Sequence, residues 1–507
     1  MRAELKYTRY QLLLIIGVYV YGYILFTPVQ LFPIFANIRP EWTCSELTGN
    51  EIPSSNCTLL EMCGDNATIV SIYTSAVQEM GLYCDRSHLG PLIATLQMAG
   101  LLVGSVVFGQ FADMYGRKPT TLVSISGMIA CSLGSTFTYS WQALAATRFL
   151  VGFSTAGFVV GVFTLVMEIL DPEHRVFVTS VFNVWGLARI IYAGIAYATQ
   201  NWRNTFIIVS AMTSPILLIV GFLVQESPRW LVQNHKMKEA ERALTRIARF
   251  NGSRDQKIDV SALEQPEVEG KRYTYKELFV TPELRWRVLL VAYVFFSCAC
   301  VSYGMDLKTG KLAENIYINT ILIGICIMLG KPLIWFVDTY LPGFNRRLLH
   351  QVSMSTTLIC LIIIAVLINF EGREISALIT VVSLIGMVVL EWVWVAVTLY
   401  AAELIPTVVR SQGFAFSSVV GRLGNVVAPY VVYLSEFWEP APFMVFIFLG
   451  LTVIIASCCW LPDTKGQELP DTLDLKSVPI VFETTDTPTN RNGDVVAKET
   501  AAVSSAQ

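Results

Sequence analysis

The chain has 507 residues, of which 54% are hydrophobic and only 15% are charged. This composition excludes an ordinary soluble protein of several domains, in which about a quarter of the residues are charged. The formal net charge of −3 is small and does not indicate a class by itself.

Apolar stretches close to the roughly 20 residues that a bilayer requires recur along the whole chain. We therefore predict an all-α membrane protein with twelve transmembrane helices. The predicted spans are 11–35, 89–112, 120–139, 142–168, 176–199, 204–225, 287–305, 316–338, 348–370, 376–400, 411–434 and 440–461. No small-residue cleavage site follows the first span, so we interpret it as a retained helix and not as a signal peptide.

The loop over residues 36–88, between the first two spans, contains four of the eleven cysteines and two N-glycosylation sequons. The cysteines are Cys44, Cys57, Cys63 and Cys84, and the sequons begin at Asn56 and Asn66. These residues predict an extracellular loop that is disulfide-bonded and glycosylated. Four cysteines allow three pairings, and the sequence does not choose among them.

A cationic turn, Gly-Gln-Phe-Ala-Asp-Met-Tyr-Gly-Arg-Lys over residues 109–118, connects the second and third spans. Basic residues flank many cytoplasmic membrane anchors, but the full spacing of this motif is more specific. It resembles the loop motif of major facilitator transporters. We expect its glycines to let two helices approach closely and its charges to form contacts that open or close the cytoplasmic face.

The second half of the chain repeats features of the first, which predicts two six-helix bundles. A Glu/Arg pair whose members are seven positions apart ends the fourth span and recurs at the end of the tenth. A degraded copy of the 109–118 motif begins near residue 338. The predicted gating residues are Gly109, Asp113, Gly116, Arg117, Lys118, Glu168, Arg175, Glu226, Arg229, Asp338, Glu403 and Arg410.

The repeats and the loops predict four regions. They are an N-terminal bundle over 1–225 that includes the long loop, a cytoplasmic loop over 226–286, a C-terminal bundle over 287–465 and a disordered cytoplasmic tail over 466–507. Within the cytoplasmic loop, residues 236–250 are expected to form an amphipathic helix that ends at Asn251-Gly252.

Orientation follows from the positive-inside rule. Residues 226–287 carry thirteen lysines and arginines, whereas the loop over 36–88 carries two. We therefore expect a multi-pass plasma-membrane protein with both termini in the cytoplasm. The sequon at Asn251 then lies inside and should carry no sugar.

Several longer stretches resemble the organic cation, organic anion and carnitine transporter family, solute carrier family 22. They are Glu-Ser-Pro-Arg-Trp-Leu at 226–231, Tyr-Ala-Ala-Glu-Leu-Ile-Pro-Thr-Val-Val-Arg at 400–410 and Leu-Pro-Asp-Thr-Lys-Gly at 461–466. The resemblance covers residues 10–475. It implies transport of small organic ions, with no cofactor and no bound metal.

Four charged residues stand inside apolar spans, where charge is costly and usually faces a pore or a partner: Arg189, Lys331, Glu391 and Arg422. Three cations against one acid leave positive charge for a substrate carboxylate to neutralise. Lys331 and Arg422 resemble the lysine and arginine that organic anion transporters place on the same two helices, although carnitine-type members share the arginine. Trp394 is a candidate for stacking on the substrate, and packing inside the bundle is the alternative role. The alternative structural role is an ion pair between Glu391 and one of the cations.

The sequence thus predicts a secondary transporter of small organic ions that favours organic anions and works by alternating access. An organic cation or a carnitine-like zwitterion is the alternative substrate, and a non-transporting receptor or scaffold is the alternative class. The chain lacks a phosphate-binding loop, a His-Glu-x-x-His motif and a Cys-x-x-Cys pair, so we predict that it is not an enzyme. The expected partners are the substrate and the lipid bilayer, without nucleic acid. A coupling ion, an exchanged anion and the oligomeric state stay open.

Overall fold

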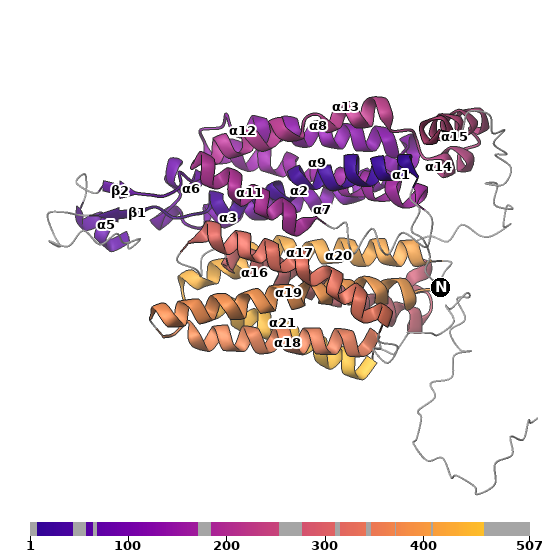
Figure 1. Ribbon diagram of the computed structural model, residues 1–507. Helices are drawn as coiled ribbons and strands as arrows, with labels where there is room; N and C mark the ends of the chain where they lie inside the picture. The colour runs from indigo at the N-terminus through magenta and orange to yellow at the C-terminus, as the bar shows by residue number, and fades with distance from the viewer. Residues whose placement is uncertain are drawn as a thin grey trace, which may run out of the picture. The chain divides into compact units, whose positions relative to one another are not determined.

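The computed structural model describes residues 8–43, 57–63, 68–170, 184–252, 276–309, 315–340, 346–370, 372–406 and 409–460. Within these residues, 10 helices are long and apolar enough to cross a membrane. Two further helices, α8 (Arg117–Ser135) and α11 (Trp185–Thr199), occupy the remaining predicted spans. The predicted all-α membrane architecture is confirmed (Figure 1).

The first span is built from four consecutive helical segments, and the sixth from three. The N-terminal half contains α1 (Arg9–Leu12), η1 (Leu13–Val20), α2 (Tyr21–Gln30), α3 (Phe32–Ala36), α7 (Leu89–Tyr115), α8, α9 (Trp141–Ile169), α11, α12 (Trp202–Thr213), α13 (Ile216–Leu218) and η4 (Ile219–Leu223). The C-terminal half contains α16 (Pro282–Thr309), α17 (Ile316–Tyr340), α18 (Arg346–Leu367), α19 (Arg373–Glu403), α20 (Arg410–Tyr433), η7 (Leu434–Glu436) and α21 (Ala441–Trp460).

Glycines set the closest helix contacts, because helices without side chains at the crossing point can approach backbone to backbone. A Cβ atom on Gly100 of α7 would lie 2.1 Å from the carbonyl oxygen of Phe149 in α9. Gly109 was expected to allow such a close approach of two helices. That expectation is wrong, since a Cβ atom on Gly109 would meet nothing within 4 Å. In the C-terminal half, Gly424 of α20 meets α16 in the same way, 2.3 Å from the oxygen of Phe296.

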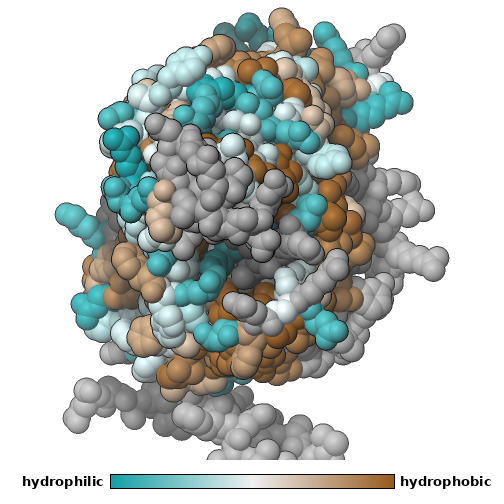
Figure 2. Space-filling view, turned by 90° about the vertical axis from the view of Figure 1, so that its left-hand side faces the viewer, coloured by the Kyte–Doolittle hydropathy of each residue, from teal (hydrophilic) through white to brown (hydrophobic). Residues whose placement is uncertain are grey.

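The end of the molecule that carries β1 (Glu41–Thr43), α5 (Cys57–Cys63), β2 (Thr68–Val70), α6 (Ala76–Glu79) and η3 (Cys84–Arg86) is called the loop end below. The two strands pair antiparallel, with Trp42 opposite Ile69. Figure 2 looks onto this end and shows hydrophilic residues across the face, with hydrophobic residues gathered toward its right-hand and lower sides.

The opposite end carries α14 (Pro228–Gln233) and α15 (Met237–Asn251) and is called the α15 end (Figure 1). The structure confirms the predicted amphipathic helix. Ala240 and Ala243 are buried against α14, and Gly252 ends the helix with a left-handed backbone (φ 95°). The ring of Phe250 packs edge-on against Tyr10 at the start of the first span, which holds α15 against the bundle.

Some predicted features lie outside the described residues. These are Cys44, Asn56, Asn66, Arg175 and the tail over 466–507, together with the side chains of Cys63, Asp338 and Glu403.

Candidate functional site

The 109–118 motif forms a charged cluster at the α15 end. Arg117 makes ion pairs with Asp113 (Nη1–Oδ1 3.0 Å) and with Glu168 of α9 (Nη2–Oε1 3.0 Å). The Glu226 carboxylate accepts hydrogen bonds from the backbone N–H groups of Arg117 (2.9 Å) and Lys118 (3.2 Å), at the positive end of the α8 dipole. Gly116 (φ 107°) leaves room for this carboxylate, which a Cβ atom would approach to 2.3 Å. The cluster is formed by residues of the N-terminal half together with Glu226, which directly follows that half.

The other predicted gating residues at this end stand apart from the cluster. Arg229 is exposed, and Arg410 donates from Nε to the Ile405 carbonyl (3.3 Å) within its own half. The motif thus ties helices of one bundle together in this conformation.

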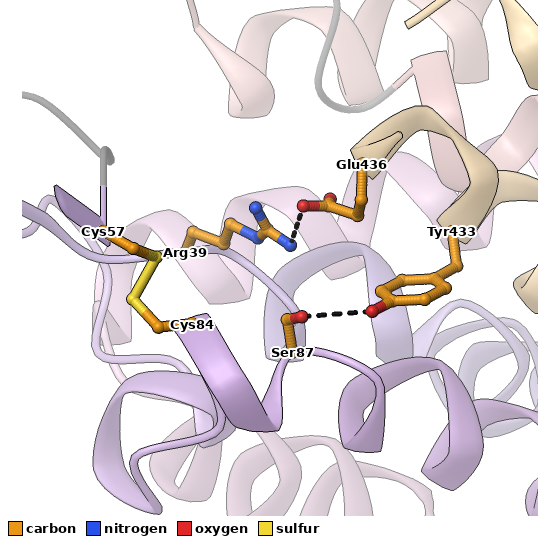
Figure 3. The surroundings of a disulfide bond; sticks show 6 residues. All are labelled: Arg39, Cys57, Cys84, Ser87, Tyr433 and Glu436. Carbon is orange, nitrogen blue, oxygen red and sulfur yellow. Dashed lines mark hydrogen bonds and ion pairs between the residues drawn. A yellow bond between two sulfur atoms is a disulfide. The ribbon is translucent and has the colours of Figure 1, made fainter. Parts of the chain in front are cut away.

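At the loop end, by contrast, polar contacts join the two halves (Figure 3). Arg39, between α3 and β1, pairs with Glu436 of η7 (Nη2–Oε2 2.6 Å). The hydroxyls of Ser87 and Tyr433 lie 3.2 Å apart. A cavity of about 50 Å³ is lined by all four of these residues and by Leu307.

A disulfide between Cys57 and Cys84 ties α5 to η3, next to these contacts (Figure 3). It is one of the pairings that the four predicted loop cysteines allow.

The contact between the halves continues deeper into the molecule. Thr95 of α7 donates to the Val426 carbonyl of α20 (3.1 Å), and Tyr303 of α16 donates to the Gln30 carbonyl of α2 (3.4 Å). Gly186 of α11 and Gly324 of α17 face each other at backbone distance. The described residues therefore form a conformation in which the halves are joined from the loop end inward.

Arg189 of α11 forms an ion pair with Asp306 of α16, across the two halves. The arginine side chain is fully buried and the aspartate side chain is 10% exposed. Asp306 was not among the predicted site residues because the predicted span ended at 305, whereas α16 continues to Thr309. The sequence signal that could have identified Asp306 was its position directly after the predicted end of the helix.

Lys331 of α17 forms an ion pair with Glu391 of α19 (Nζ–Oε2 2.8 Å), with side chains 10% and 17% exposed. This is the structural role that the sequence left as the alternative for Glu391. Trp392 donates from Nε1 to the Gly330 carbonyl (3.0 Å), which fixes the two helices beside the pair.

Arg422 of α20 differs from these two cations. It is partly buried, and its Nε lies buried without a hydrogen-bond partner. No carboxylate among the described residues pairs with it within 4.0 Å. It stands one helical turn from Val426, whose carbonyl contacts the other half. Among the cations predicted for substrate binding, Arg422 is the one left uncompensated in the described structure.

A further buried cation, Arg148 of α9, was not among the predicted site residues. Its guanidinium lies 3.4 Å from the ring centre of Phe32 and 4.5 Å from that of Phe206, and it donates to Ser135 Oγ (3.0 Å). All these partners belong to the N-terminal half. Its role is therefore packing and cation–π contact within one bundle.

Aromatic side chains lie near the charged residues. Tyr23 of α2 is within electrostatic range of Glu391, and it packs edge-on against Phe26, 5.2 Å between ring centres. On the other side, Trp394 donates from Nε1 to Ser302 Oγ (2.8 Å) and packs edge-on against Phe295. Tyr23 of the N-terminal half thus lies near Glu391 of α19, the helix that also carries Trp394.

The arrangement suits reversible binding of a small organic ion by charge and aromatic contact. Among the described residues, no group of three His, Cys, Asp or Glu side chains could hold a metal ion.

Residues 65–472 match the family described as Sugar (and other) transporter. The chain is 32% identical over 416 residues to solute carrier family 22 member 7 of Bos taurus, covering 79% of this chain and 73% of that protein. The chain belongs to this transporter family. It is 30% identical over 454 residues to organic cation/carnitine transporter 4 of Arabidopsis thaliana, covering 87% of this chain and 83% of that one. It is a membrane transporter of the major facilitator, solute carrier 22 type and not an enzyme.

The fold is also that of solved transporters. The inward-open structure of the xylose transporter XylE from E. coli aligns with a TM-score of 0.63 at 15% identity, covering 90% of this chain and 97% of XylE. At this identity the likeness establishes the major facilitator fold alone.

Proposed function

We propose that this transporter carries small organic anions with a carboxylate group across the plasma membrane by alternating access. The single observation that carries the proposal is Arg422, a cation within a membrane-spanning helix that no described carboxylate neutralises. An uncompensated charge at this depth costs several kcal/mol. A substrate carboxylate that binds the guanidinium removes that cost and gains a charge-assisted hydrogen bond.

The aromatic residues favour a flat organic group beside that carboxylate. Ser302 and Phe295 hold Trp394 in place. A substrate that stacks on the Trp394 ring therefore causes little further loss of side-chain entropy. An aromatic monocarboxylate such as hippurate combines both features.

In the proposed cycle the loop end faces the extracellular space and the α15 end faces the cytoplasm, as the distribution of lysine and arginine supports. The described conformation is then closed toward the outside. Opening it requires separation of Arg39 from Glu436 and of Ser87 from Tyr433.

The test is uptake of labelled hippurate by cells that express wild-type or variant protein, normalised to the amount at the cell surface. Arg422→Gln and Arg422→Asp should lower uptake at least about tenfold, the equivalent of one lost charge-assisted contact of about 1.4 kcal/mol. Arg242→Gln, on the exposed face of α15, is the matched control and should transport normally. Unchanged hippurate uptake by Arg422→Asp would disprove the site.

Competition distinguishes the alternative substrates. Unlabelled carboxylates should compete with hippurate, whereas a quaternary ammonium ion should not. Strong competition by carnitine alone would indicate a zwitterion carrier, the class named for the Arabidopsis relative.

A further inference from the structure

We propose that Glu391 determines the charge class of the substrate. Its carboxylate occupies Lys331 and so leaves Arg422 as the uncompensated cation among the described residues predicted for substrate binding, which limits the site to monoanions and excludes dianions. The inference rests on the proposed function and adds a specificity-determining residue to it.

The pair faces the region between the halves. Glu391 is on α19 but lies within electrostatic range of Tyr23 from the N-terminal half and of Asp306 on α16. It stands three residues before Trp394, on the same side of the helix. A substrate that stacks on Trp394 therefore meets the pair.

The pair is also held rigidly. Gly330 and Val388 bring α17 and α19 together, since a Cβ atom on the glycine would lie 2.5 Å from the valine side chain. With the Trp392 hydrogen bond to the Gly330 carbonyl, this contact fixes both backbones next to Lys331 and Glu391. A carboxylate that is part of the protein competes for Lys331 at a high effective concentration.

A second substrate carboxylate would have to displace Glu391 from Lys331. The displaced carboxylate would then be buried without a partner, which is strongly unfavourable. Asp306 offers no relief, because it adds negative charge near Glu391 and is itself paired with Arg189. The two ion pairs are neutral, so among the described residues predicted for substrate binding Arg422 gives a net charge of +1.

The experiment compares two probes that differ in one charge, glutarate and its monomethyl ester. Wild-type protein should take up the monoester at least about tenfold better than the dianion. Glu391→Gln removes the competing carboxylate with little change in shape, so Lys331 can bind a second substrate carboxylate. The ratio of monoester uptake to glutarate uptake should therefore fall at least about tenfold. Lys331→Met combined with Glu391→Gln should restore the wild-type ratio.

Glu439→Gln is the matched control. It removes an acid that also pairs with a lysine, Lys308 (3.2 Å), but at a site where its side chain is 62% exposed. Its uptake ratio should equal that of the wild type.

Each outcome is decisive. If wild-type protein takes up no monoanion, the proposed function fails. If it takes up the monoester through Arg422 but Glu391→Gln leaves the ratio unchanged, only the role of Glu391 is overturned. If Glu391→Gln does not fold, the test is inhibition of labelled hippurate uptake by wild-type protein. Glutarate that inhibits this uptake as well as its monoester would contradict the inference. Inhibition by glutarate that is at least about tenfold weaker would support it.

Discussion

A buried charge in this molecule is costly unless a partner compensates it. The fully buried Arg189 side chain is compensated by Asp306 from the other half. Such a pair contributes little compared with apolar residues of the same shape, but removal of one partner leaves a buried charge and costs about 3–5 kcal/mol. In the Lys308–Glu439 pair the lysine side chain is 6% exposed but the glutamate side chain is 62% exposed, so water reaches the pair and it contributes less than a fully buried one.

Asp306→Asn should therefore lower the melting temperature of the detergent-purified transporter by several degrees, because Arg189 loses its counter-charge. The double variant Arg189→Gln with Asp306→Asn should recover much of the loss. Glu439→Gln should melt close to the wild type. Equal melting temperatures for Asp306→Asn and wild type would show that the pair contributes nothing to stability.

At the scale of elements, the loop end joins the halves through short segments and the last residue of one long helix, α20. The stretch between α3 and β1 supplies Arg39, the turn after η3 supplies Ser87, and the end of α20 with η7 supplies Tyr433 and Glu436. Each contact contributes on the order of 1 kcal/mol, so together they shift the balance between closed and open conformations without fixing it.

Tyr433→Phe combined with Glu436→Gln should therefore raise the fraction of molecules that are open at the loop end. Leu307 lines the cavity behind these contacts and is 7% exposed, so Leu307→Cys can report opening. Labelling of this cysteine by a membrane-impermeant maleimide should become severalfold faster in the double variant. Leu307→Cys alone gives the reference rate and the parent protein gives the background. No change in rate would mean that these contacts do not hold the loop end closed.

At the scale of the whole molecule, the two bundles meet along α7 with α20 and α11 with α17, and the polar contacts that join them extend from the loop end inward. The charged cluster around Arg117 lies at the other end and ties one bundle together. This arrangement fits a carrier whose halves rock about a central site, with the cluster keeping the N-terminal bundle rigid during the movement.

Orientation makes a separate prediction. Glycosidase treatment of the cell-expressed protein should reduce its mass, and Asn56→Gln with Asn66→Gln should abolish that shift. Asn251→Gln should leave the shift unchanged, since the Asn251 side chain accepts a hydrogen bond from the Tyr10 backbone (3.0 Å) at the α15 end. A sugar on Asn251 would reverse the proposed orientation.

Hydropathy predicted the helices well because the bilayer fixes their length locally. The span expected at 142–168 is α9 at Trp141–Ile169, and the amphipathic helix near 236–250 ends at Gly252 as its sequence indicates. Partners across helices could not be predicted in the same way. Glu391 with Lys331 and Asp306 with Arg189 are distant in sequence, and only the packing of separate spans brings them together. The open space around Gly109 likewise depends on which neighbours surround it.

Uptake of labelled hippurate into proteoliposomes that contain only the purified transporter tests the proposed function most directly. We expect saturable uptake that unlabelled carboxylates inhibit and that Arg422→Gln lowers at least about tenfold. Liposomes without protein give the background. An absence of saturable flux for hippurate and for every other organic ion tested would contradict the proposed function and would indicate a receptor or scaffold built on a transporter fold.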